Sequence, residues 1–293
     1  MHAESPAPAR LLVTGAHGLL GREILRLAPT AIGLGRAELD ITDRAAARAL
    51  LRAGDVVVNC AAYTAVDAAE TDRAAAFAVN ADGPAALADA CADTGARLIH
   101  LSTDYVFPGT AQRPYETTDP TGPVTVYGAS KLAGERAVLD RAPAAHVVRT
   151  AWVYTGVTGD FVATMRRLEA TRDTISVVDD QRGSPTAAPD LAAALLDLAA
   201  RPGAPRLLHA TNAGEATWYD LARAVFIELG ADPERVHPCD SAAFPRPAPR
   251  PAYSVLSPAS WIDAGLTPLR PWREALTATL RRTADPSEHA GNP

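Results

Sequence analysis

A tyrosine and a lysine stand four residues apart, at Tyr127 and Lys131. Residues at this spacing share one face of a helix, so we expect the phenol and the ammonium to lie close together. A phenol alone has a pKa near ~10, and a neighbouring cation favours its ionised form. Lys131 is therefore expected to lower the pKa of Tyr127 and to make it a proton shuttle near neutral pH.

Hydroxyl and carboxyl side chains follow an apolar run that ends at Leu101. Polar groups at the carboxyl end of a central strand face the ligand crevice of a parallel sheet. Thr103 can therefore hydrogen-bond a substrate carbonyl and the Tyr127 oxygen. Asp104 has two interpretations: it binds a sugar hydroxyl, or it caps a loop.

Three glycines with the spacing G-x-x-G-x-x-G follow the first apolar run and open a helical pattern. Glycine lets a turn adopt positive φ and lets a pyrophosphate approach the backbone, and the helix N-terminus offers free N–H groups to the phosphates. The loop therefore predicts dinucleotide binding, and Lys131 could then hold the nicotinamide ribose hydroxyls. The expected contacts are Gly15, His17, Gly18, Leu19, Leu20 and Gly21.

The adenosine end of the cofactor is expected near residues 35–41. At the end of a second strand, an acidic residue would hold a ribose 2′-hydroxyl, whereas a basic residue suits a 2′-phosphate. Arg36 therefore favours NADPH, with NADH as the alternative, unless it is a solvated surface arginine. Asp40 and Ile41 are placed to face the adenine. Alternatively, Asp40 only leads into the next helix, with Thr42 as its cap.

Short apolar runs alternate with helical patterns through the first half of the chain. The predicted strands cover 11–13, 31–34, 55–60, 97–101 and 146–149. The predicted helices include 42–53 and 71–93, the second capped by Thr71 and broken or kinked at Gly83-Pro84. This alternation indicates a parallel sheet covered on both faces. The fold class is therefore α/β: a Rossmann-type doubly wound parallel sheet with a smaller mixed α/β substrate-binding lobe.

The second half has a looser pattern. Helices are predicted at 188–200 and 217–229, and the second places Trp218 in the core. The proline-rich stretch 244–251 can be neither a helix nor a central strand. The expected organisation is a Rossmann domain over 9–155 and about 186–212, a lobe over about 156–185 and 213–282, and flexible tails at 1–8 and 283–293.

Composition excludes several classes of protein. The 293 residues are 47% hydrophobic and 21% charged, which excludes disorder of the whole chain. Lys plus Arg is 28 against 34 for Asp plus Glu, and the net charge of −6 argues against nucleic-acid binding. Three distant cysteines form no disulfide framework or zinc spacing. No apolar run is long enough for a membrane span, and residues 1–9 do not resemble a signal peptide, so we expect a cytoplasmic location.

Several segments together resemble the dTDP-4-dehydrorhamnose reductases, which belong to the extended short-chain dehydrogenase/reductases. The resemblance runs from about Leu11 to Leu280 and implies reduction of the C4 ketone of a dTDP-4-keto-6-deoxy-L-hexose with NAD(P)H. The segments that carry it are the glycine loop, 59–67, 102–107, Tyr127 with Lys131, 149–154, 179–186 and Arg250-Pro251.

The resemblance also implies roles for individual residues. Tyr127 would be the proton donor and Lys131 its partner, while Thr103 takes the place of the usual catalytic serine. Three residues after the third strand would line the nicotinamide side: Ala61, Ala62 and Tyr63. The implied substrate contacts are Thr64, Val66, Thr103, Asp104, Trp152, Phe161, Gln181 and Arg250.

Within this substrate set, Trp152 would stack on the sugar. Phe161, Gln181 and Arg250 would bind the dTDP part. An arginine is the natural bidentate partner of a diphosphate, although Arg250 could also be a plain surface residue.

Some members of this family hold a magnesium ion between carboxylates at a dimer interface. Glu23 matches one such position, but the glutamate expected around 186–190 is out of register. We therefore expect no metal ion and leave the choice between monomer and homodimer open.

Three rival functions remain at this point. The sequences of several segments are also similar to those of dihydrostreptose synthases, which couple the reduction to ring contraction. An epimerase or dehydratase of the same superfamily is a second rival. Dehydration is disfavoured because Tyr105 follows Asp104 where a glutamate would be needed. The third rival is a non-catalytic regulatory subunit that binds nucleotide, although Tyr127 and Lys131 are both present.

Overall fold

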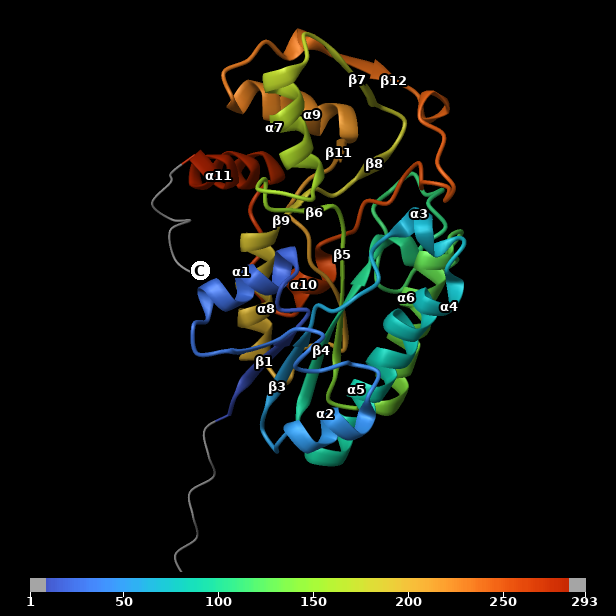
Figure 1. Cartoon of the computed structure of the whole chain (residues 1–293), viewed down its shortest axis with the longest axis vertical. Helices are drawn as coiled ribbons and strands as arrows, with labels where there is room; N and C mark the ends of the chain where they lie inside the picture. Colours follow the sequence, from blue (N-terminus) through green and yellow to red (C-terminus); the bar gives the residue numbers. More distant parts are fainter. Residues whose placement is uncertain (1–8, 285–293) are drawn as a thin grey trace, which may run out of the picture.

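The computed structural model describes residues 9–284 and is built around one parallel sheet, with a group of smaller elements beyond one end of it (Figure 1). The strand order is β10-β5-β4-β3-β1-β2, and every neighbouring pair is parallel. The strands are β1 (Leu11–Thr14), β2 (Ile32–Leu34), β3 (Val56–Asn59), β4 (Arg97–Thr103), β5 (His146–Thr150) and β10 (Leu207–His209).

The order of the strands creates one switch point. The chain runs from β1 outward to β2 and then crosses to β3 on the other side of β1. Open α/β sheets bind ligands beyond the carboxyl ends of the strands, at the point where the strand order reverses. The crevice next to the ends of β1 and β3 is therefore the place where this sheet can hold a nucleotide.

Helices cover both faces of the sheet (Figure 1). Two hydrophobic clusters, one on each face, join the helices to the strands. The predicted doubly wound α/β class is therefore confirmed. One face carries α1 (Leu19–Leu27), α8 (Ala188–Ala199) and α10 (Ala259–Asp263), and the other carries α2 (Arg44–Leu50), α5 (Gly83–Thr94) and α6 (Val126–Arg141).

The predicted helix over 71–93 is interrupted. After α3 (Val66–Ala69), it consists of α4 (Arg73–Phe77), a π-helical turn (Ala78–Asp82) and α5. Asp72, rather than Thr71, caps α4, because its carboxylate accepts the Ala75 N–H. The expected interruption near Gly83-Pro84 takes the form of the π turn. Pro84 itself fits the first turn of α5, where no N–H is needed.

The helix predicted at 42–53 is shorter than expected. It spans Arg44–Leu50, and Asp43 caps it by accepting the Ala46 N–H. Thr42 instead donates both its backbone N–H and its hydroxyl to Asp40. The carboxylate of Asp40 therefore organises the turn that leads into α2.

The smaller elements pair with one another rather than with the main sheet, and they surround a third hydrophobic cluster. The residues 244–251 form neither helix nor strand, as predicted. The strand pairs are β6 (Val153–Tyr154) with β9 (Thr186–Ala187), β7 (Ile175–Val178) with β12 (Val236–Cys239), and β8 (Arg182–Gly183) with β11 (Ala216–Thr217). The helices are α7 (Phe161–Thr171), α9 (Trp218–Glu228) and α11 (Trp272–Ala284).

The last helix corrects one predicted boundary. α11 continues to Ala284, so residues 283 and 284 are helical and not part of a tail. The remainder of the two predicted tails, 1–8 and 285–293, lies outside the described residues. The division into a Rossmann domain and a substrate lobe stays a proposal.

A buried ion pair ties α6 to the sheet. Arg149 on β5 donates through two nitrogens to the two carboxylate oxygens of Glu135 on α6, each at 2.8 Å. Both side chains are almost fully buried. A buried charge without a partner is strongly destabilising, so this pair holds α6 against the sheet only while both residues are present.

The variant Arg149→Met is expected to lower the free energy of unfolding by about 3–5 kcal/mol, because Glu135 would stay buried without a partner. Adding Glu135→Leu should recover most of that loss. Urea unfolding measures both effects. The control is Arg113→Met, which removes an exposed pair with Asp119 and should cost less than about 1 kcal/mol. If Arg149→Met lowered the free energy of unfolding as little as the Arg113→Met control does, the proposed role of the buried pair would be wrong.

Candidate active site

The glycine turn brings the ends of β1 and β3 into contact. Gly15 has φ 67°, and a Cβ there would lie 2.6 Å from the Ala61 nitrogen. A Cβ on Gly21 would collide with the Gly15 carbonyl oxygen, while the Gly18 N–H donates to that same oxygen at 2.9 Å. The close approach that the spacing predicts is therefore present, although the phosphate contacts themselves stay a prediction.

Asn59 locks this junction with its side chain. Its Oδ1 accepts the Thr14 hydroxyl at 2.6 Å and the Ala61 N–H at 3.1 Å. Its amide also lies 3.0 Å from the His100 Nδ1 on β4. One buried amide thus joins β1, β3 and β4 at the switch point.

The proposed adenosine end carries a loosely held arginine. The side chain of Arg36 is 90% exposed and lies 3.9 Å from Asp40. The His17 ring packs against Gly35, where a Cβ would come within 2.6 Å of its Nε2. Glu38, to which no sequence motif pointed, accepts the Gly35 N–H through its carboxylate at 2.8 Å.

Ile41 has a different environment from its neighbour Asp40. It is buried, and its side chain fills the space beside Gly83 at the start of α5. Its proposed contact with adenine stays a prediction.

Tyr127 and Thr103 meet at the carboxyl end of β4. Tyr127 lies in the first turn of α6, which begins after the cap residue Thr125. Desolvation of its phenol raises the pKa of Tyr127 to about 12, although the nearby Thr103 hydroxyl acts to lower it. The phenol therefore holds its proton at neutral pH, which suits a proton donor.

The effect expected of Lys131 on the pKa of Tyr127 is absent from this structure. The Lys131 ammonium donates to the Leu101 carbonyl oxygen at 2.6 Å and is 3% exposed. Burial lowers its own pKa to about 8, while Glu135 and Cys60 act to raise it. Desolvation therefore dominates both groups, and the expectation of a lowered tyrosine pKa is wrong for the protein without ligand.

Asp104 offers a free carboxylate oxygen next to these residues. Its Oδ1 accepts the Thr103 hydroxyl at 2.9 Å, while its Oδ2 has no hydrogen-bond partner within residues 9–284. Burial raises the pKa of Asp104 to about 6, while the nearby hydroxyls of Ser254 and Thr103 act to lower it. Thr103, and not Asp104, caps the short 3-10 turn (Asp104–Val106). The capping role that the sequence left open for Asp104 is therefore not observed.

Asn80 holds the segment that follows β3, a role that the sequence analysis did not assign. The π turn directs it toward Tyr63, whose N–H it accepts at 2.8 Å and whose carbonyl it bonds at 3.0 Å. Its amide also donates to Ser130 on α6 at 3.0 Å. A π turn inside a helix is a signal that often marks functional sites.

The segment that Asn80 holds contains the residues proposed to line the site. Ala61, Ala62 and Tyr63 are half-buried, Thr64 is exposed, and Val66 begins α3 and is half-buried. They connect the end of β3 to α3. Their contacts with cofactor and substrate stay predictions.

A second group of predicted residues gathers around Trp218. The Trp152 ring stacks on Trp218 with 3.5 Å between centroids, and Phe161 packs on Trp218 at 4.6 Å. Gln181 accepts the Trp218 indole N–H at 3.1 Å and donates to Ser241 at 2.7 Å. Trp218 is half-buried and belongs to this cluster, so the prediction of a simple core residue was incomplete.

Trp152 itself adopts an unusual backbone conformation. Its φ is 46°, a region that non-glycine residues rarely occupy. Such strain persists only when its surroundings hold it, and it gathers at functional sites. One face of the Trp152 ring is covered by Trp218, so its proposed stacking on a sugar would have to use the remaining surface.

Arg250 is paired with a carboxylate. One of its nitrogens donates to Asp67 on α3 at 2.9 Å, and another donates to the Ala248 carbonyl oxygen at 2.9 Å. It is therefore not a free surface arginine, and it spans from the proline-rich stretch to the segment after β3.

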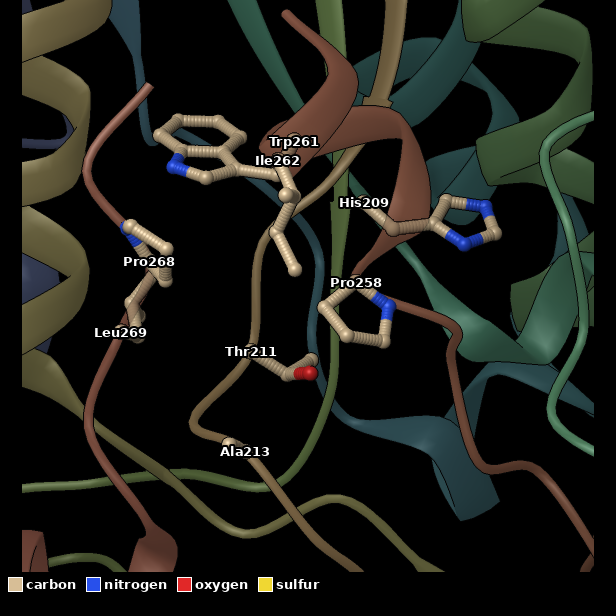
Figure 2. Close-up of a pocket in the computed structure, with 8 residues that line it drawn as sticks. All are labelled: His209, Thr211, Ala213, Pro258, Trp261, Ile262, Pro268 and Leu269. Atoms are coloured by element: carbon tan, nitrogen blue, oxygen red, sulfur yellow. The ribbon is translucent and has the colours of Figure 1, made fainter. Parts of the chain in front are cut away.

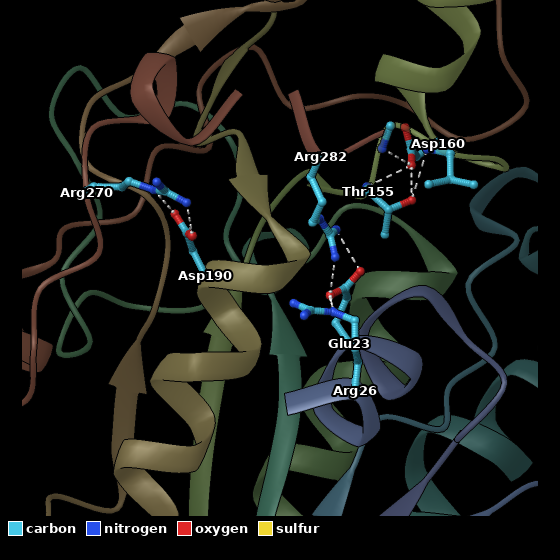
Figure 3. A network of polar contacts seen from close by, with 9 residues as sticks. Glu23, Arg26, Thr155, Asp160, Asp190, Arg270 and Arg282 are labelled. Carbon is cyan, nitrogen blue, oxygen red and sulfur yellow. Dashed lines mark hydrogen bonds and ion pairs between the residues drawn. The ribbon is translucent and has the colours of Figure 1, made fainter. Parts of the chain in front are cut away.

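The residues present do not fit a magnesium centre. Glu23, the position matched to a metal ligand, is held by Arg26 on one side and by two bonds from Arg282 on the other, as Figure 3 shows. Asp190, in the region where a second ligand was sought, pairs with Arg270. Within residues 9–284 no three ligating side chains cluster. The prediction about the metal ion stays untested.

A small pocket elsewhere does not fit a nucleotide. Figure 2 shows His209, Pro258 and Trp261 around it, beside the carboxyl end of β10. Its volume is about 40 Å³, whereas ligand sites usually span ≈ 300–1,000 Å³. This pocket is therefore not the proposed nucleotide site, which the strand order favours at the switch point.

Comparison with known proteins identifies the family. The family model described as "RmlD substrate binding domain" matches residues 9–284. A dTDP-4-dehydrorhamnose reductase of Mycobacterium tuberculosis is 57% identical over 285 residues, covering 94% of each chain. The chain belongs to the dTDP-4-dehydrorhamnose reductase family. It is accordingly an NAD(P)H-dependent oxidoreductase, and the family resemblance seen in its motifs is confirmed.

Two further relatives are informative. A probable dTDP-4,6-dihydroxy-2-methyloxan-3-one 4-ketoreductase of Streptomyces antibioticus is 54% identical, covering 91% of this chain and 93% of its own. The crystal structure of a dTDP-4-dehydrorhamnose reductase from Bacillus anthracis in complex with NADP superposes with a TM-score of 0.88 at 32% identity, covering 94% of this chain and 100% of that one. None of the helices within residues 9–284 is long and apolar enough to cross a membrane.

Asp104 should make the stability of this reductase depend on pH. Its pKa is about 6 in the folded chain, above the usual value of 3.8 for an aspartate, so the folded state binds more protons between these values. The free energy of unfolding should therefore fall as the pH rises through this window, by on the order of 3 kcal/mol. The experiment is urea unfolding from pH 4 to 7 of the wild type and of Asp104→Asn, in which this contribution is lost. The exposed Asp173→Asn is the control, and identical pH slopes for wild type and Asp104→Asn would contradict the assignment.

Proposed function

We propose that this chain reduces the C4 ketone of a dTDP-4-keto-6-deoxy-L-hexose with NADPH. The observation that carries the proposal is the desolvated phenol of the half-buried Tyr127, which lies beside the Thr103 hydroxyl at the carboxyl end of β4, next to the switch point. A protonated phenol at this position can supply the proton that a ketone oxygen takes up when the ketone is reduced, and the hydroxyl can hydrogen-bond that oxygen. Bound NADPH would supply the hydride.

The proton would come from Tyr127. As the C4 oxygen gains negative charge, Tyr127 and Thr103 would stabilise it by hydrogen bonds, and Tyr127 would then transfer its proton to it. Lys131 lies one helical turn further along α6, and its pKa of about 8 allows it to hold a proton at neutral pH. We therefore assign Lys131 the return of the proton to the phenolate.

The substrate would lie between the two groups of residues described above. Asp104, whose Oδ2 has no hydrogen-bond partner within residues 9–284, would accept a sugar hydroxyl, with Thr64 and Val66 on the neighbouring segment. Trp152, Phe161 and Gln181 would hold the rest of the nucleotide sugar, and Arg250 would bind its diphosphate.

The variant Tyr127→Phe should reduce kcat by about 10²–10⁴-fold, because it removes the proton donor and keeps the ring. The affinity for NADPH should not change. The assay follows the loss of NADPH absorbance with dTDP-4-keto-L-rhamnose, and NADPH binding is measured by fluorescence. The matched control is Tyr219→Phe on α9, whose hydroxyl accepts a hydrogen bond from Arg223 and has no assigned role in catalysis, and it should retain full activity. Near wild-type turnover of Tyr127→Phe with unchanged binding would refute the assignment.

The preference for NADPH should depend on Arg36. The side chain is exposed, and its one ion-pair partner within residues 9–284 is Asp40 at 3.9 Å, so it is free to reach a 2′-phosphate. The variant Arg36→Ala should raise the KM for NADPH by about ten-fold and leave the KM for NADH unchanged. Arg48→Ala on α2 provides a control with another exposed arginine. Equal effects on both cofactors, or none on either, would exclude the proposed contact.

Product analysis separates the rival reactions. Ring contraction and simple reduction would use the same Tyr127, Lys131 and hydride donor, so these residues do not distinguish them. We favour simple reduction because the relatives at 57% and 54% identity carry the names of reductases. NMR of the product identifies which sugar forms, and a ring-contracted sugar would replace this proposal. No consumption of NADPH would favour the non-catalytic regulatory subunit.

A further inference from the structure

Asp67 joins two segments that are far apart in the sequence. It lies on α3, in the segment that follows β3, and its Oδ2 accepts a hydrogen bond from Arg250 at 2.9 Å. Its Oδ1 accepts the Ala248 N–H at 3.3 Å. A second arginine, Arg246, lies 3.9 Å away. One carboxylate therefore holds both the side chain of Arg250 and the backbone of the proline-rich stretch 244–251.

Arg250 keeps donors available in this arrangement. Its guanidinium has five N–H groups, of which one points at Asp67 and one at the Ala248 carbonyl oxygen. Within residues 9–284 its Nε has no hydrogen-bond partner. The side chain is thus anchored at two points while other N–H groups remain free for an anion.

The segment that carries Arg250 is fixed on its other side as well. A Cβ on Gly109 would collide with Pro251, and the Tyr253 N–H donates to the Gly109 carbonyl oxygen at 3.0 Å. With Asp67 on one side and Gly109 on the other, the backbone around Arg250 has little freedom. A binding group held in this way loses less conformational entropy when its ligand arrives.

The cluster of Arg246, Arg250 and Asp67 has a charge that suits a phosphate, and it lies near the proposed active site. Arg246 and Arg250 share one carboxylate, so the cluster has a net charge of +1, which suits a phosphate group. Burial acts to raise the pKa of Asp67, but the hydrogen bonds from Arg250 and Ala248 outweigh it and lower the pKa. The charges of Arg250 and Asp67 both act on Tyr105, whose ring lies 5.6 Å from that of Tyr127.

We propose that Asp67 is a positioning residue that holds Arg250 ready to bind the diphosphate of the nucleotide sugar. The proposal rests on the proposed function, in which Arg250 contacts that diphosphate. Asp67 touches neither the sugar nor the cofactor in this account. It acts through Arg250 alone, by fixing the side chain and the backbone that carries it.

A competing view treats Asp67 as a rival of the diphosphate for Arg250. Removal of the carboxylate would then strengthen the binding of a diphosphate. The geometry favours positioning, because Asp67 uses only one N–H group of Arg250 and leaves its Nε free. The two views predict opposite signs, which makes the binding of dTDP the decisive measurement.

The experiment compares dTDP and thymidine as probes for wild type, Asp67→Ala and Asp67→Asn by isothermal titration calorimetry. Asp67→Ala should raise the Kd of dTDP by about ten-fold and leave the Kd of thymidine unchanged, since thymidine carries no phosphate. Asp67→Asn keeps an acceptor for the Ala248 N–H but loses the charge, and it should give an intermediate effect. In turnover, the KM for the nucleotide sugar should rise while kcat and the KM for NADPH stay near their wild-type values.

A double-variant cycle shows whether Asp67 acts through Arg250. If it does, Asp67→Ala should have no further effect on dTDP binding in the Arg250→Ala background. The matched control is Asp119→Ala, which removes the carboxylate of the exposed pair with Arg113 and should leave dTDP binding unchanged.

Unchanged or tighter dTDP binding by Asp67→Ala, or additive effects in the cycle, would overturn the positioning role. These outcomes leave the proposed function intact, because wild-type turnover of the keto-sugar tests that function separately. A wild-type protein that turns over the keto-sugar but does not bind dTDP would overturn the role of Arg250 and, with it, that of Asp67. Absence of both binding and turnover would overturn the proposed function itself.

Discussion

The close contact between the Gly15 turn and the backbone of Ala61 shapes the place where we propose that the cofactor binds. It brings the carboxyl ends of β1 and β3 together at the point where the strand order reverses. Asn59 then bonds across the junction to Thr14 and Ala61. Any side chain at Gly15 would separate these segments, so the crevice and the loop above it both depend on a missing Cβ.

Desolvation sets the proton chemistry beside that crevice. Tyr127 and Asp104 have raised pKa values and Lys131 has a lowered one, and in each case burial is the largest cause. All three shifts favour the uncharged form, as expected where water is excluded. A site of this kind keeps a proton on its phenol, and a hydrogen bond donated there to a developing negative charge is stronger than in water.

Carboxylate–guanidinium pairs join distant parts of the chain around this site. Glu135 and Arg149 fasten α6 to the sheet, Glu23 and Arg282 join α1 to α11, and Asp67 reaches the proline-rich stretch. The first pair is buried, so it orders the helix that carries Tyr127 but requires both partners. In the second pair, a guanidinium takes the position beside Glu23 that a cation would need.

Residue types and spacings alone were enough to predict the parallel α/β sheet, the glycine turn, and the helix that carries Tyr127 and Lys131. These features follow from the order of apolar runs and from spacings within one turn or helix, which are local. Three contacts became visible only in the folded chain: Lys131 bonds a strand carbonyl, Asn80 turns inward at a π turn, and Asp67 holds Arg250. Each of these depends on burial or on contacts between segments distant along the chain. Residues that are neighbours in the sequence do not determine the local dielectric, which shifts pKa values. They also do not determine the distance between remote segments, which decides which side chains pair.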